Sequence, residues 1–153
     1  MTTATQALAA LKARLTVGSG ITLPMYWLGD DPPVLPDTPA AFAYLVFNNE
    51  GSGAGPSSFG GGRGANTYRN RAMLEGYVFA PLTGADGMGP VMTHAESIAA
   101  RLRSYRDGSI SCFSADIIPV GPGSSVAPPG FVSEVNNYNC AIVEVALSFD
   151  QIG

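Results

Sequence analysis

The clearest strand signal in this chain is the stretch Tyr138-Asn-Cys-Ala-Ile-Val-Glu-Val-Ala-Leu-Ser-Phe149. Successive side chains of a strand point to opposite faces, so alternating residues share one face. The apolar face consists of Ala141, Val143, Val145, Leu147 and Phe149, and the other carries Ile142, Glu144 and Ala146. This pattern predicts a long strand of an antiparallel sheet with one face packed on the core.

Other segments predict further strands of the same sheet. Residues 41–48 are apolar on both faces, which is typical of a strand in the middle of a sheet. Residues 21–28 alternate, but Pro24 cannot donate a hydrogen bond to a neighbouring strand and therefore favours an edge position. The remaining predicted strands are residues 68–81, 109–120 and 131–135, the last paired with the closing strand around Asn136-Asn137.

Two segments have the spacing of amphipathic helices. Residues 3–17 place leucines three and four apart behind Thr3, which suits a helix N-cap. Residues 90–105 repeat apolar side chains at helical spacing and begin with Pro90, a residue favoured in the first helical turn. The order of elements predicts one α+β domain over residues 1–153, a mostly antiparallel sheet with two helices packed on one face.

The segment 50–67 differs from the rest of the chain in composition. Glycine occupies seven of the fifteen positions from Glu50 to Gly64, and few side chains there could build a core. A phosphate-binding loop is excluded, because it needs a lysine after its glycines and the only lysine of the chain is Lys12. We therefore expect a long, mobile, Gly-rich hairpin loop that serves an interaction.

The composition excludes several classes of function. Charged residues make up 13% of the chain and the net charge is -4, so a nucleic-acid binder or a polybasic membrane-surface protein is not expected. No apolar run reaches the length of a membrane span, and the N-terminus lacks the basic start of a signal peptide. We expect a protein made in a cytoplasm, with Cys112 and Cys140 as buried free thiols rather than a disulfide.

Residues capable of catalysis are few and scattered. The single histidine, His94, lies on the second predicted helix, and no nucleophile motif accompanies it. The strand residues Glu75 and Glu144 leave open a carboxylate pair for glycoside chemistry, although solvated strand acids are commoner. We expect no catalytic residue, no cofactor and no metal site.

Three arginines gather at the Gly-rich loop and the strand that leaves it, in a chain with few cations. They could be solubilising charges, or their planar guanidinium groups could pair with carboxylates across an interface. Phe59 strengthens the second hypothesis, because an isolated aromatic in a polar loop can anchor a partner. The predicted interface residues are Arg63, Arg69, Arg71 and Phe59, with Asp30, Asp31 and Glu50 as acidic partners.

The layout resembles the tail terminator (tail completion) proteins of long-tailed bacteriophages and related gene-transfer particles. The resemblance spans nearly the whole chain and rests on arrangement: an N-terminal helix, an apolar strand, a long hairpin loop, a second strand, a second helix and a closing strand. The segments that carry it are residues 6–15, 42–47, 77–81, 95–102 and 141–149.

This resemblance implies a structural protein of the virion, assembled in the host cytoplasm, and not an enzyme. Members of the family form a sixfold ring that caps the tail tube, ends its polymerisation and presents a surface to the head connector. The implied partners are therefore further copies of the chain, the tube protein and the connector, with DNA passing through the lumen unbound. Alternatives are another head–tail joining protein of the neck, or a small hydrolase or ligand-binding domain with a Gly-rich lid.

Overall fold

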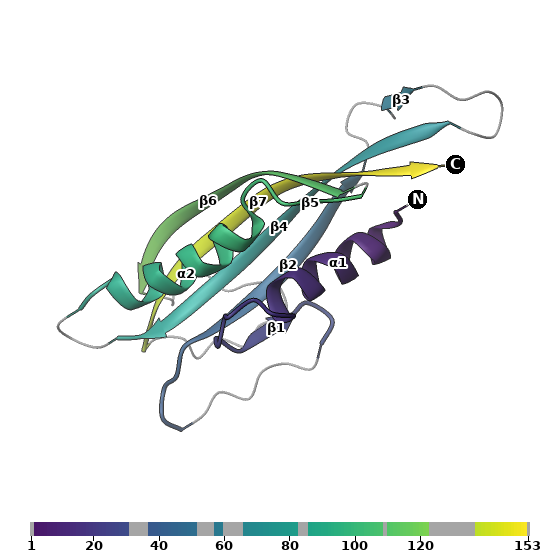
Figure 1. Cartoon of the computed structure of the whole chain (residues 1–153). Helices are drawn as coiled ribbons and strands as arrows, with labels where there is room; N and C mark the ends of the chain where they lie inside the picture. The colour runs from purple at the N-terminus through teal and green to yellow at the C-terminus, as the bar shows by residue number, and fades with distance from the viewer. Residues whose placement is uncertain are drawn as a thin grey trace.

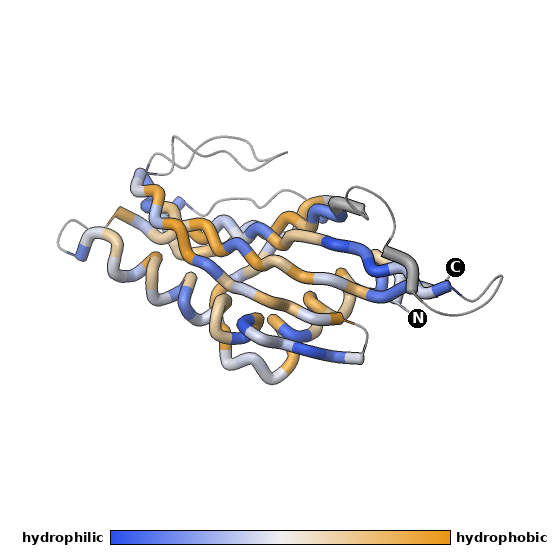
Figure 2. Tube along the Cα trace, turned by 90° about the horizontal axis from the view of Figure 1, so that it is seen from above, coloured by the Kyte–Doolittle hydropathy of each residue, from blue (hydrophilic) through white to orange (hydrophobic). Residues whose placement is uncertain are grey.

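The computed structural model describes residues 2–30, 37–51, 57–59, 66–82, 86–108, 110–122 and 137–152. In this part of the chain, two helices cover one face of a seven-stranded sheet (Figure 1). The predicted α+β fold with a mostly antiparallel sheet is confirmed. A view turned by 90° separates the two layers and shows hydrophilic residues gathered at the end of the sheet where the termini lie (Figure 2).

The sheet has the strand order β1-β2-β4-β7-β6-β5, and β3 pairs with one end of β4. Neighbours are antiparallel except β1 and β2, which run parallel. The longest ladder joins β4 and β7 from Thr67 opposite Ile152 to Pro81 opposite Tyr138. The strands are β1 (Met25–Trp27), β2 (Phe42–Gly51), β3 (Ser57–Phe59), β4 (Thr67–Pro81), β5 (Arg106–Asp107), β6 (Ile110–Pro122) and β7 (Tyr138–Ile152).

The helices are fixed by their own sequence signals and by each other. Helix α1 (Ala4–Thr16) begins with a reciprocal cap, in which the Thr3 hydroxyl accepts from the backbone of Gln6 and the Gln6 side chain accepts from the backbone of Thr3. Helix α2 (Gly89–Leu102) begins with a proline in its first turn. The two helices are joined near their C-terminal ends, where the Arg14 side chain donates to the Arg101 carbonyl and the Arg101 side chain donates back to the Arg14 carbonyl.

The main core lies between these helices and the sheet. All five residues of the predicted apolar face of β7 are buried there, so the alternation in the sequence placed this strand correctly. The opposite face holds a second cluster, in which Phe42 and Phe79 stack at 4.9 Å and Tyr138 meets both rings edge-on. Cys140 is buried in the same cluster. The helix-free face of the sheet is therefore apolar at one end.

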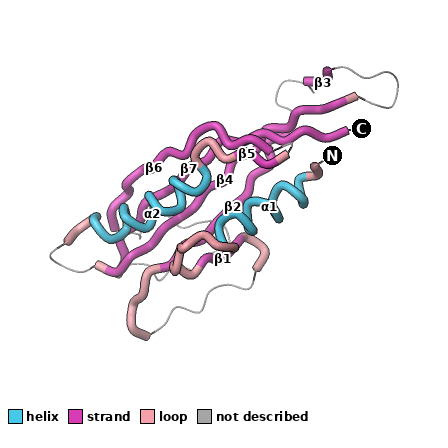
Figure 3. The backbone as a smooth tube through the Cα atoms, viewed as in Figure 1, coloured by secondary structure: helices cyan, strands magenta, loops and turns pink. Residues whose placement is uncertain are grey.

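Several predicted boundaries differ from the structure (Figure 3). The first strand covers only Met25–Trp27 of 21–28, at the edge that Pro24 indicated. Helix α2 ends at Leu102 rather than at residue 105, because Ser104 adopts a left-handed backbone with φ of 58° and the chain turns into β5. In the predicted loop 50–67, the first two residues extend β2, and residues 57–59 form β3, which pairs with β4. Residues 52–56 and 60–65 of this loop lie outside the described part of the chain. The predicted strand 131–135 also lies outside it.

Candidate functional site

A bulge in β6 turns an aromatic side chain toward solvent on the helix-free face. Cys112 pairs with Leu147 and Ser114 pairs with Ala146, so Phe113 is an extra residue in the strand. Its side chain is 59% exposed, and Ile118 further along β6 is 42% exposed. We call Phe113 and Ile118 the β6 patch. Both are large apolar side chains exposed on the helix-free face, and the exposed Asp116 lies between them along the strand.

A hollow of about 410 Å³ lies beside Phe113 on this face. It spans three neighbouring strands and combines an apolar wall with arginine side chains. Its lining residues are Arg69, Arg71, Ala72 and Met73 from β4, Phe113 from β6, and Ala146, Leu147 and Ser148 from β7. The hollow suits a group that is apolar along one side and negatively charged at its end.

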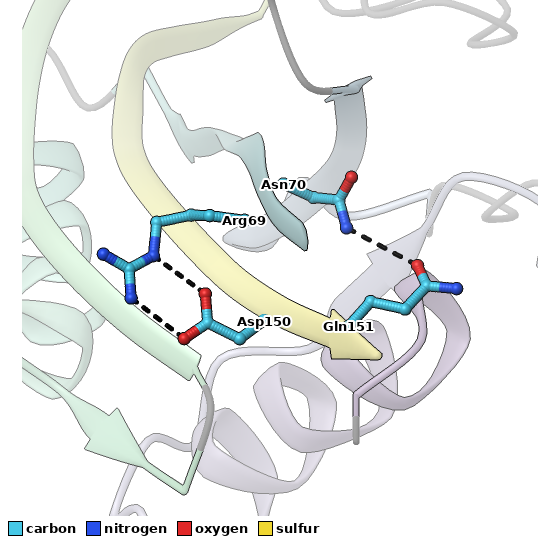
Figure 4. A network of polar contacts seen from close by, with 4 residues as sticks. All are labelled: Arg69, Asn70, Asp150 and Gln151. Atoms are coloured by element: carbon cyan, nitrogen blue, oxygen red, sulfur yellow. Dashed lines mark hydrogen bonds and ion pairs between the residues drawn. The ribbon is translucent and has the colours of Figure 1, made fainter. Parts of the chain in front are cut away.

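The two arginines of the hollow have different surroundings. The Arg69 guanidinium donates two hydrogen bonds, of 2.8 and 2.9 Å, to the Asp150 carboxylate of its own chain. The contact between Asn70 and Gln151 lies on the opposite side of β7 (Figure 4). These hydrogen bonds lower the pKa of the Asp150 carboxyl. Arg71 makes no ion pair with any residue that the structure describes. Among the described side chains, Arg69 is thus the arginine of the hollow that is engaged within the chain.

Two further exposed apolar residues flank α1 and β1, which lie near each other at one edge of the sheet (Figure 1). Val17, the C-cap of α1, is 75% exposed, and Leu28, which follows β1, is 47% exposed. We call these two residues the β1 patch. Beside it, Lys12 forms an ion pair of 3.4 Å with Asp30 and lies 5.2 Å from the centre of the Trp27 ring.

The two patches lie toward opposite edges of the sheet. The β1 patch is at the β1 edge, and the β6 patch lies on the strand next to β5, which forms the other edge. Their residues differ, so one patch is not a copy of the other. The sequence reasoning missed both patches, although a change in the phase of apolar residues along β6, from Ile110 and Cys112 to Ala115 and Ile117, marks the bulge.

The predicted interface residues are only partly brought together. Arg69 and Arg71 line one hollow, whereas Asp30 pairs with Lys12 beside the β1 patch. Asp31 and Arg63 lie outside the described residues, as do the side chains of Glu50 in β2 and Phe59 in β3. Asp30 therefore does not pair with Arg69, because the Arg69 guanidinium is hydrogen-bonded to Asp150.

Acidic side chains form a row across the middle of the helix-free face. Glu75 on β4 lies opposite Glu144 on β7, and Glu144 lies opposite Asp116 on β6. The Tyr77 hydroxyl donates to Glu75 at 3.2 Å. Burial raises the pKa of Tyr77 to about 12, and the neighbouring Glu75 carboxylate adds to the rise. Like charges directly opposite one another on neighbouring strands weaken a sheet.

We expect Glu144→Gln to stabilise the protein by about 0.5 kcal/mol, because it removes repulsion from both neighbouring acids. Chemical denaturation at pH 7 measures the change. Glu96→Gln, on the exposed side of α2, is the matched control and should leave the free energy of unfolding unchanged. A loss of stability in the Glu144 variant would show that its carboxylate is held by favourable contacts instead.

The groups considered for catalysis do not converge. His94 lies on α2, which packs on one face of the sheet, whereas Glu75 and Glu144 lie on the opposite face. Among the described residues, no group of three or more histidine, cysteine or acidic side chains could hold a metal ion. The two faces of the sheet thus keep the histidine away from the paired acids.

Both cysteines are free and buried, as the sequence predicted. Cys112 belongs to the core under the helices and Cys140 to the cluster on the other face, so the sheet separates them. Burial raises the pKa of Cys112 to about 11 and that of Cys140 to about 12. They act as small apolar residues.

These thiols predict a loss of stability at alkaline pH. The pKa values of the two thiols are higher in the folded chain than in the unfolded one. Their contribution to the free energy of unfolding is therefore full below about pH 8.5 and falls as the pH rises toward 11. Urea midpoints at pH 8 and pH 10 measure the fall. The control is the double variant Cys112→Ala/Cys140→Ala. Its urea midpoint should fall less between pH 8 and pH 10, because it lacks both thiols and only the contribution of Tyr77 remains. Equal falls in both proteins would contradict the assignment.

Comparison with known proteins supports the fold. A solved structure whose name states no activity is 14% identical in sequence and superposes with a TM-score of 0.54, and the match covers 100% of this chain and 99% of the other. At this identity the match bears on the architecture alone. No protein-family model and no curated protein matches the chain.

Proposed function

We propose that this chain is a structural subunit that assembles head-to-tail into a closed ring, as a tail terminator does at the end of a phage tail tube. The observation that carries the proposal is the pair of unlike apolar patches toward opposite edges of the sheet. When one patch of a copy binds the other patch of the next copy, the assembly keeps one unused patch at each end. Further copies therefore add until the ring closes.

The chemistry of both patches supports burial against protein. Phe113 and Val17 are each more than half exposed in the single chain, and the buried centre of a protein interface is more apolar than its rim. The uncovered face of an antiparallel sheet is normally polar. Here the apolar residues at its β6 side serve the next subunit rather than the core of their own.

In the proposed particle the ring caps the tail tube, stops its growth and offers a surface to the head connector, with DNA passing through the lumen. A net charge of -4 suits a channel that DNA must pass without sticking. No described helix is long and apolar enough to span a membrane. The proposal gives the chain no catalytic role and places it at the head–tail junction of a virion assembled in the host cytoplasm.

A tube-elongation assay tests this function. The tube protein of the same particle is polymerised with and without this chain, and tube lengths are measured by electron microscopy. We expect added ring to shorten the tubes and to be visible at one end. Rings that leave tube length unchanged and bind the connector would instead indicate a neck protein, and hydrolytic activity in a monomer would indicate an enzyme.

A further inference from the structure

The hollow beside Phe113 has one cation without a described acidic neighbour. Phe113, Met73 and Ala146 give it an apolar lining, and Arg71 also lines it. Since Arg69 is bound to Asp150, an occupant would be recognised by Arg71. The matching ligand is an exposed apolar side chain with a carboxylate close by.

The turn that follows β1 carries this combination. Leu28 is 47% exposed, and the side chain of Asp30 is 49% exposed. Gly29 between them has a φ of 98°, and the Asp30 amide donates to the Trp27 carbonyl at 2.9 Å, so both residues belong to one tight turn. The ion pair from Asp30 to Lys12 is exposed at both ends and therefore weak enough to be exchanged for an arginine fork.

The turn and the hollow of one chain lie in different parts of the sheet. The Leu28 amide donates to the carbonyl of Leu45 in β2, and Leu45 is paired with Gly76 of β4. The hollow lies further along β4, from Met73 to Arg69, and extends away from β1 to β6. A contact between turn and hollow therefore joins two copies.

We propose that the Leu28–Asp30 turn of one copy seats in the Arg71 hollow of the next, with Leu28 against Phe113 and Asp30 paired with Arg71. This inference rests on the proposed ring and names the contact that builds it. Because turn and hollow lie at different places on the subunit, the contact repeats head-to-tail around the proposed ring, and every copy uses both.

Charge reversal at both ends of the pair tests the contact. Arg71→Glu brings two carboxylates together at each junction, and Asp30→Arg brings two guanidinium groups together. Each variant alone should therefore associate at least about tenfold more weakly than the wild type. Mixing the two variants should restore association to near the wild-type level. In a ring where the two variants alternate, each junction joins either the two native residues or the two substituted ones, so opposite charges meet at all of them.

Two controls separate this contact from other effects. Lys12→Ala removes the same pair within the chain as Asp30→Arg does, and should associate like the wild type. Arg106→Glu reverses an exposed arginine on β5 that does not line the hollow, and should also associate normally. Thermal unfolding establishes that all variants are folded.

The outcomes distinguish the contact from the ring. If the wild type forms a ring and both reversed variants form it equally well, the contact is overturned and the proposed function stands. Variants that dissociate but are not restored by mixing also overturn the pairing. A wild type that stays monomeric at every concentration overturns both.

Discussion

Phe113→Asp should leave the chain monomeric. Phe113 is 59% exposed in the single chain, so the substitution costs little folding free energy, but it buries a carboxylate at the centre of the proposed junction. We expect the dissociation constant of the junction to rise about a hundredfold or more, which corresponds to about 2.7 kcal/mol. Analytical ultracentrifugation of wild type and variant at matched concentration measures it.

Leu28→Asp is the counterpart of this variant at the other patch. Alone it should also be monomeric, since each variant has lost one of its two contact surfaces. Mixed in equal amounts, the two should form a one-to-one dimer and nothing larger, because one intact junction remains between them. A Phe113→Asp protein that assembles like the wild type would contradict the account of the β6 patch.

Phe79→Ala should have the largest effect on folding. Phe79 is fully buried on the helix-free face, where its ring stacks on Phe42 and meets Tyr138. Truncation removes the apolar contacts and leaves a cavity, so we expect a loss of about 3–5 kcal/mol in the free energy of unfolding. Urea denaturation measures the loss.

Phe113→Ala is the matched control for this substitution. It removes the same side chain from an exposed position and should change the stability of the monomer by less than about 0.5 kcal/mol. Equal losses in the two variants would show that Phe113 packs against its own chain, and both its exposure and its place in the interface would then be wrong.

The parts of the fold that could be predicted from the sequence depend on local signals. Thr3 and Gln6 carry the cap of α1 in a four-residue pattern, and the strict alternation of β7 specifies which face is buried. Pro24 placed β1 at an edge because its missing donor is a property of the residue itself. The burial of Cys112 and Cys140 follows from their positions in apolar strands.

The candidate site could not be predicted in the same way, because it is assembled from residues far apart in the chain. The hollow combines β4, β6 and β7, and only the pairing of these strands brings Arg71 and Phe113 together. The bulge exposes Phe113 by inserting a single residue, which alternation alone does not reveal. The pairing of Arg69 with Asp150 depends likewise on the register of β4 and β7, which are 81 residues apart at this point.

The most direct test of the proposed ring is the mass of the wild-type particle by light scattering over a wide range of protein concentration. The account predicts a species of about six times the 15.8 kDa of one chain, with no assembly that stops at a dimer. A tight dimer would pair the two patches reciprocally across a two-fold axis and would contradict the ring. A monomer at every concentration would contradict the ring.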